Sequence, residues 1–154
     1  MKKILSLTLF IIIALGCSKS KSGYTNPYLP NNPVNITIDL TFPQFDDLKY
    51  ANGHVIVPNQ GVAGPQGGVV VFNMGGEQYR AFDIICPNHQ IDFKCSRMKV
   101  DGPRSIFITC YCGEYHQEPL KYSLITGTSM TPGAQYQMKP YPVVKRGNII
   151  TINY

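Results

Sequence analysis

Residues 69–86 read VVVFNMGGEQYRAFDIIC and decide the fold of this chain. The runs 69–73 and 78–84 are rich in β-branched and aromatic residues, which favour strands. Between the two runs lies Gly75–Gly76, a pair that suits a turn with positive φ. We therefore predict a β-hairpin whose second strand leads into Cys86.

A second hairpin of the same kind follows. Its predicted strands are residues 98–100 and 105–109, its turn is Asp101-Gly102-Pro103, and its second strand leads into Cys110. Two hairpins that each end in a cysteine bring two cysteine-bearing loops within reach of one another. That is the geometry that a shared metal or a covalent cross-bridge needs.

The remaining chain also has the pattern of strands. Residues 34–40 alternate apolar and polar side chains, and shorter β-rich runs cover residues 54–57, 121–124, 141–144 and 148–153. No stretch keeps a helical period for three turns, and the chain contains 14 glycines and 12 prolines. We therefore predict an all-β fold, and the 154 residues allow one such domain.

The N-terminus has the anatomy of a secretory signal. Lys2 and Lys3 precede an apolar run over residues 4–15, which is too short for a helix that spans a bilayer. The run ends Ala14-Leu15-Gly16-Cys17, which resembles the lipobox of bacterial lipoproteins, where cleavage precedes a cysteine that is then acylated. Ser18 resembles the pattern that passes lipoproteins on to an outer membrane. An ordinary signal peptide with an incidental cysteine is the alternative.

The lipobox resemblance divides the chain into three parts. Residues 1–16 are the expected lipoprotein signal peptide, residues 17–33 a lipidated Cys17 with a flexible tether, and residues 34–154 the all-β domain. The tether is rich in Ser, Lys, Gly, Asn and Pro and lacks an apolar period. We expect the protein in the cell envelope, held by its lipid on the outer membrane and facing the periplasm.

The charge pattern gives no sign of a nucleic-acid interface. The formal net charge is +5, but lysine and arginine are spread along the chain without a run. With Cys17 set aside, an even number of cysteines remains in an oxidising compartment: Cys86, Cys95, Cys110 and Cys112. Two disulfides, a metal site, or one disulfide with two ligands all remain open.

Two histidines lie close to these cysteines in the sequence. Cys86-x2-His89 is on one predicted loop, and Cys110-x-Cys112-x3-His116 is on the other. Thiolate and imidazole ligands together suit zinc or an iron–sulfur cluster. The candidate metal ligands are therefore Cys86, His89, Cys110 and His116, and no catalytic residue is assigned.

From residue 69 to residue 154 the chain resembles the Rieske iron–sulfur family. The matching features are the hairpins that lead to Cys86-Pro87 and Cys110-Tyr111-Cys112, the run YSLITG at 122–127, and the Pro132-Gly133-Ala134 loop. The resemblance implies stacked antiparallel sheets and a small subdomain whose two loops hold a [2Fe–2S] cluster. In the family, one cysteine from each loop binds one iron, and one histidine from each loop binds the other.

The family's cysteines carry over residue by residue. The thiolate ligands fall on Cys86 and Cys110, and a disulfide found in some members falls on Cys95 with Cys112. Such a bridge stabilises a small secreted domain by about 2–4 kcal/mol.

The family's two histidines match less directly. Asn88 stands at the first position with His89 one residue later, and Gly113 stands at the second with His116 three residues later. Because both imidazoles must converge on one iron from the tips of two tight loops, the resemblance leaves both outside the site.

The sequence therefore favours a cluster-free, disulfide-stabilised structural or interaction module. Its bridges are Cys95–Cys112 and, in a two-disulfide form, Cys86–Cys110. The alternatives are a [2Fe–2S] electron carrier that uses Cys86, Cys110 and the displaced histidines, or a zinc site. Each function implies a redox or structural protein partner in the periplasm. No oxygenase activity is implied, because the family's oxygenases add a large catalytic domain for which this chain has no length.

Overall fold

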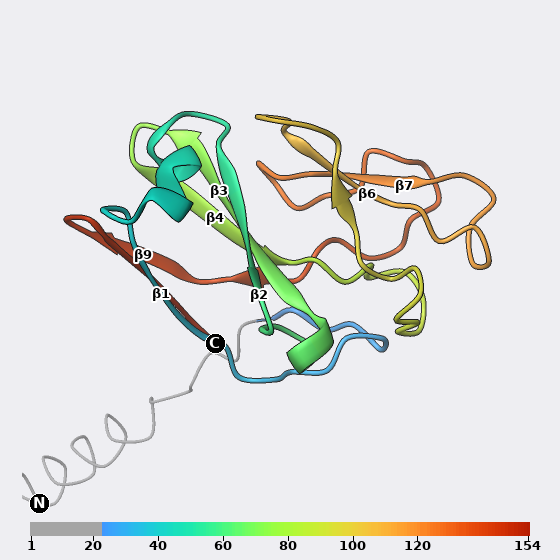
Figure 1. The fold of residues 1–154 in the computed structure, drawn as a ribbon. Helices are drawn as coiled ribbons and strands as arrows, with labels where there is room; N and C mark the ends of the chain where they lie inside the picture. The colour runs from blue at the N-terminus through green and yellow to red at the C-terminus, as the bar shows by residue number, and fades with distance from the viewer. Residues whose placement is uncertain (1–22) are drawn as a thin grey trace, which may run out of the picture.

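The computed structural model describes residues 23–154, which form ten β-strands and two short 3-10 helices (Figure 1). The predicted signal segment and Cys17 lie outside the described residues. Within residues 23–154, no helix has the length and apolar character needed to cross a membrane.

The strands form three sheets, and every strand pair in them is antiparallel. The first has the order β1-β10-β9, with bounds Asn35–Asp39, Ile149–Asn153 and Val143–Arg146. The second has the order β2-β3-β4-β8, with bounds His54–Pro58, Gly68–Gly75, Gln78–Asp83 and Pro140–Tyr141. The third has the order β5-β6-β7, with bounds Lys99–Val100, Phe107–Cys110 and Leu120–Ser123. The helices are η1 (Pro43–Lys49) and η2 (Gly64–Gln66).

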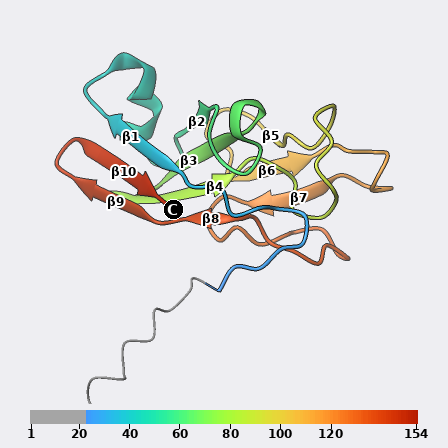
Figure 2. The same cartoon turned by 90° about the horizontal axis from the view of Figure 1, so that it is seen from below.

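Strand β3 is the centre of the fold because both of its faces are covered. Val69 and Val71 belong to a core shared with β1 and β10, whereas Val70 and Phe72 belong to a second core shared with β6 and β7. All four side chains are fully buried. A strand covered on both faces needs a continuous apolar run, and residues 69–72 supply one. Figure 2 shows the third sheet at the opposite end of the molecule from β9 and β10.

The prediction of an all-β fold with stacked antiparallel sheets and a small two-loop subdomain is confirmed. Strands β3 and β4 form the first hairpin, in which Gly75 and Gly76 have φ values of 96° and 58°. Strands β5 and β6 form the second hairpin, and Cys110 is the last residue of β6. Cys86 follows the end of β4 by three residues, so both loops leave a strand of the core.

One predicted strand is divided between two sheets. The sequence predicts a single strand over residues 141–144, but Tyr141 pairs with β4 in the second sheet and Val143 pairs with β10 in the first. Pro142 lies at the crossing. Because proline has no N–H to donate to a ladder, it marks the point where the chain changes sheets.

Much of the expected tether packs on the domain. Leu29 is buried against Ile85, and the Asn26 side-chain nitrogen donates to the Pro87 carbonyl oxygen at 2.8 Å. Residues before the expected domain boundary at residue 34 therefore contact the domain. These contacts come from isolated apolar and amide side chains, which leave no periodic pattern in the sequence.

Replacing Gly127 by alanine is expected to destabilise the domain by about 2 kcal/mol. At a φ of +77°, a residue with a Cβ loses about 1 kcal/mol of stability through backbone strain. The added Cβ would also lie 2.6 Å from the Phe82 ring, and this overpacking adds a similar loss. Gly133→Ala is the matched control, because its φ is +86° but no atom lies within 4 Å of the added Cβ. Urea unfolding measures both variants, and equal losses would contradict the tight packing of Gly127 on Phe82.

Candidate metal centre

The two cysteine loops bring four metal-binding side chains together. Cys86 and His89 come from the loop between β4 and β5, whereas Cys110 and His116 come from the end of β6 and the loop before β7. One ligand atom from each of the four lies within 4.8 Å of the other three. Two contacts cross between the loops: Cys110 Sγ lies 3.5 Å from His89 Nε2, and Cys86 Sγ lies 3.9 Å from His116 Nε2.

The thiol pair is buried and shares a proton. Cys86 and Cys110 are both fully buried. A hydrogen bond with Cys86 lowers the pKa of the Cys110 thiol, whereas the same bond, together with burial, raises the pKa of Cys86. The two sulfurs therefore favour a state with one thiolate, and the remaining proton must leave when a cation binds both sulfurs.

Backbone and thiol contacts orient the imidazole of His89, which is also buried. Burial lowers the pKa of His89, but hydrogen bonds with Cys110 and the Gln90 carbonyl outweigh it and raise that pKa. Its Nδ1 lies 2.7 Å from the Gln90 carbonyl oxygen, to which it donates as N–H. A histidine held in this way by one nitrogen presents the other to a metal, and Nε2 faces the thiols.

Asn88 locks the first loop to its neighbours. Its side-chain nitrogen donates to the Tyr122 hydroxyl and to the Tyr136 carbonyl, each at 2.7 Å. Its side-chain oxygen accepts from the backbone N–H groups of Gln135 and Tyr136 at 2.7 and 3.0 Å. The Tyr122 hydroxyl accepts from Asn88, and its interaction with Cys86 lowers the pKa of that thiol against the larger effects that raise it.

The second loop folds back over the site in a single turn. The N–H groups of Tyr115 and His116 both donate to the Cys112 carbonyl, at 3.0 and 3.1 Å. A disulfide joins Cys112 to Cys95, so the turn is covalently tied to the first loop. Tyr115 stacks on His89, with ring centroids 4.5 Å apart and an interplanar angle of 11°.

This arrangement corrects the expected position of both histidines. The spacing placed His89 and His116 outside the site of Cys86 and Cys110, but the structure gathers all four into one group. His116 returns because the turn after Cys112 reverses the chain. His89 reaches the thiols with Nε2, the ring nitrogen farther from the backbone.

The four cysteines of residues 23–154 form one bridge and not two. Cys95 and Cys112 are joined as the family resemblance implied, whereas Cys86 and Cys110 are free thiols. The two-disulfide form is therefore not the form that the structure shows. The two free thiols face imidazoles instead.

Three residues of the site were not assigned from the sequence: Asn88, Tyr115 and Tyr122. Asn88 stood out only as a departure at a family histidine position, although its amide holds the loop. The spacing of four residues between Cys112 and His116 matches one turn and was a signal for the turn that carries Tyr115, but not for its stacking on His89. The Tyr122 hydroxyl left no signal, because a tyrosine is expected in a predicted strand whether or not its hydroxyl serves a site.

The sequence matches no protein-family model. It also matches no curated protein. Among solved structures, the chain is similar to the ferredoxin of carbazole 1,9a-dioxygenase from Nocardioides aromaticivorans IC177. That match has 16% sequence identity and a TM-score of 0.44, and it covers 79% of this chain and 97% of that chain.

The donor set fits a metal centre. Two thiols and two imidazoles are the ligands preferred by zinc and by mixed cysteine–histidine iron–sulfur centres. The His89 ring is held by a backbone carbonyl, and the loops are held by Asn88 and by the Cys95–Cys112 disulfide. These supports fix ligand orientation in the way that metal sites require.

Replacing Tyr115 by alanine is expected to weaken metal binding by about tenfold, because the His89 ring loses the aromatic face that holds and shields it. Tyr115→Phe keeps the stack and is expected to stay within about twofold of the wild type. Tyr111→Ala, an exposed tyrosine of the same loop, is the matched control. Competition with a chelator measures all three, and an equal loss in Tyr115→Phe would assign the effect to the hydroxyl.

Proposed function

We propose that this protein is a lipid-anchored one-electron carrier of the cell envelope whose Rieske-type domain holds a [2Fe–2S] cluster. The observation that carries the proposal is the convergence of two free thiols and two imidazoles from two hairpin loops. Cys86 and Cys110 would hold one iron, and His89 and His116 the other. A cluster held in this way supplies a one-electron redox couple.

The side chains around the four ligands suit that role. The Tyr122 hydroxyl lowers the pKa of the Cys86 thiol, and polar groups beside ligand sulfur are one of the means by which proteins set a cluster's potential. Tyr115 covers the ring of His89, while His116 stays half-buried and is the ligand most open to solvent. Electrons would therefore enter and leave on the His116 side.

The test is a metal analysis of the chain from residue 18 onward, purified without oxygen from iron-replete cells. We expect about two irons and two acid-labile sulfides per chain, visible absorption bands, and an EPR signal after reduction. A colourless protein without iron would overturn the proposal, and one that also lacks any other metal would return the domain to the cluster-free interaction module.

A single zinc ion is the second candidate, and the ligand spacing favours it. A tetrahedral ion with Zn–S of about 2.3 Å and Zn–N of about 2.0 Å separates sulfur from nitrogen by about 3.5 Å. The two measured sulfur–nitrogen contacts are 3.5 and 3.9 Å. One zinc per chain, without sulfide or an EPR signal, would assign the site to a structural zinc and the protein to binding, not electron transfer.

The proposed anchor is tested separately through Cys17. Cells fed radiolabelled palmitate are expected to label the wild-type protein and not Cys17→Ser, and only the wild type should enter the membrane fraction. Equal labelling of both would remove the lipid from the proposal while leaving the metal centre untouched.

A further inference from the structure

A basic hollow of about 550 Å³ lies beside the disulfide, between β2 and the chain that leads into β5. Its rim carries three cationic side chains, Lys94, Arg97 and Lys99, and the imidazole of His54. Its apolar lining includes Ile56, Met98 and Val100, and no acidic residue lines it. The hollow thus combines an apolar floor with charge of a single sign.

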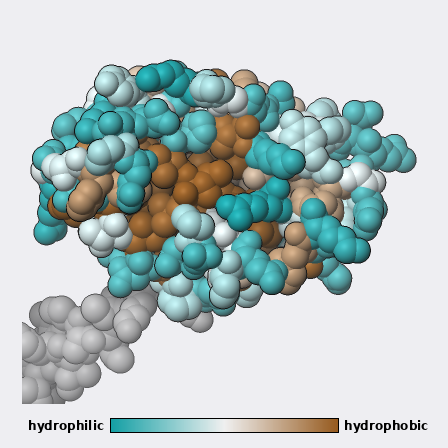
Figure 3. Space-filling view, in the orientation of Figure 1, coloured by the Kyte–Doolittle hydropathy of each residue, from teal (hydrophilic) through white to brown (hydrophobic). Residues whose placement is uncertain are grey.

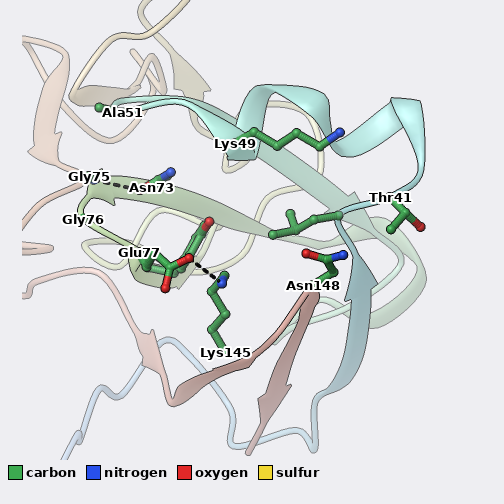
Figure 4. A pocket seen from close by; sticks show the side chains of 11 residues that line it. Thr41, Lys49, Ala51, Asn73, Gly75, Gly76, Glu77, Lys145 and Asn148 are labelled. Carbon is green, nitrogen blue, oxygen red and sulfur yellow. Dashed lines mark hydrogen bonds and ion pairs between the residues drawn. The ribbon is translucent and has the colours of Figure 1, made fainter.

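The cations of the basic hollow have no partners. Within residues 23–154, Lys94, Arg97 and Lys99 take part in no ion pair. A second hollow shows the contrast: Lys145 lies 2.9 Å from Glu77, as Figure 4 shows, and Lys49 on its rim pairs with Asp46 at 2.6 Å. Of these two hollows, the basic hollow alone has cations without an ion pair, so it presents an uncompensated positive field to a ligand.

His54 adds an unsatisfied polar atom at the same place. Its Nδ1 is buried and has no hydrogen-bond partner among the described residues. Burial lowers the pKa of His54, so the ring is neutral at neutral pH and its nitrogen remains available for hydrogen bonding. Buried polar atoms of native proteins are almost always satisfied, so this nitrogen indicates a group supplied from outside.

Two sheet edges border the hollow. Strand β2 is the edge of the second sheet and β5 is the edge of the third, so each has a side without a partner strand in the described chain. In the view of Figure 3, hydrophobic side chains gather over β2 and β3, with hydrophilic side chains around them. An unpaired edge beside an apolar surface is the usual docking place for an extended peptide.

We propose that the basic hollow and the β2 edge bind an extended acidic segment of a partner protein. Backbone groups of the segment would pair with β2, its acidic side chains would meet Lys94, Arg97 and Lys99, and an apolar side chain would enter the floor. Cys95 lies in the same loop as these cations, so the partner would sit against the disulfide side of the metal centre. The proposal does not depend on which metal is bound.

The test uses the full chain in detergent micelles and a labelled short peptide in which glutamate alternates with valine. Arg97→Glu combined with Lys99→Glu is expected to weaken binding by about tenfold. Lys49→Glu combined with Arg146→Glu makes the same change in charge away from the hollow and is expected to stay within about twofold. Backbone amide NMR should show shifts at residues 54–57 and 93–100 for the wild type.

Other outcomes would overturn the proposal. A peptide with lysine in place of glutamate that bound equally well would remove the charge argument, and equal weakening in both double variants would show a general charge effect. If anionic phosphatidylglycerol micelles shifted residues 93–100 and displaced the peptide, the face would be a membrane contact. If inorganic phosphate displaced it at low concentration, the hollow would be a site for small anions.

Discussion

Cys110→Ser is expected to abolish metal binding. Cys110 is fully buried, its sulfur contacts His89 Nε2 at 3.5 Å, and a hydrogen bond with Cys86 lowers its pKa. Serine has nearly the same shape, so the fold should persist, but its hydroxyl does not ionise at neutral pH and replaces a soft ligand by a hard one. We expect bound metal to fall by more than about tenfold and the visible spectrum of a cluster to disappear.

The control is Cys17→Ser in the full chain, the same chemical change outside the candidate centre, which is expected to alter membrane attachment but not metal content. Metal content by mass spectrometry of the purified proteins measures both, with thermal unfolding as a check that the Cys110 variant folds. Full metal content in both Cys110→Ser and Cys86→Ser would place the metal elsewhere and contradict the four-ligand site.

The same thiol pair makes metal binding sensitive to acid. Burial and the hydrogen bond to Cys110 raise the pKa of Cys86, so its proton must leave before both sulfurs can bind a cation. Metal affinity should therefore fall as pH falls, because protons compete for the sulfurs. In the Cys86→Ser variant, the remaining metal affinity should change less with pH than that of the wild type.

The sheets were predictable because their patterns are local. Strand β1 alternates apolar and polar residues, and Gly75–Gly76 suits the turn of the first hairpin, so each element shows its own period or turn. The division of residues 141–144 between two sheets was not predictable, because it depends on which strands lie beside Tyr141 and Val143. Sheet membership is a property of the tertiary contacts.

The site was predictable only in part for a related reason. Cys110 ends strand β6 and Cys86 follows the end of β4 by three residues, so the hairpin pattern alone places both thiols. His116 reaches the site through a turn closed on the Cys112 carbonyl, and His89 through its farther ring nitrogen. A comparison of residue spacings measures neither the reversal of a chain nor the reach of a side chain.

Removing the disulfide by Cys95→Ala with Cys112→Ala is expected to lower the unfolding free energy by about 3 kcal/mol. The bridge spans a sequence separation of 17, and closing a loop of this length restricts the unfolded chain by roughly that amount. For a domain of this size the loss corresponds to a fall in Tm of roughly 10 °C. Urea and thermal unfolding measure it, and a change below about 1 kcal/mol would contradict the entropic estimate.

The disulfide should also strengthen metal binding. The variant His116→Ala separates this effect from the effect on the unfolding free energy. Cys112 begins the turn that presents His116, so loss of the bridge is expected to weaken metal binding by about tenfold in the wild-type background. In the His116→Ala background, removing the disulfide should change metal binding little, because the ligand that the disulfide positions is already absent. The stability loss should be equal in both, since the restriction of the unfolded chain does not involve His116. Additive losses of metal affinity would instead show that the disulfide supports the thiols.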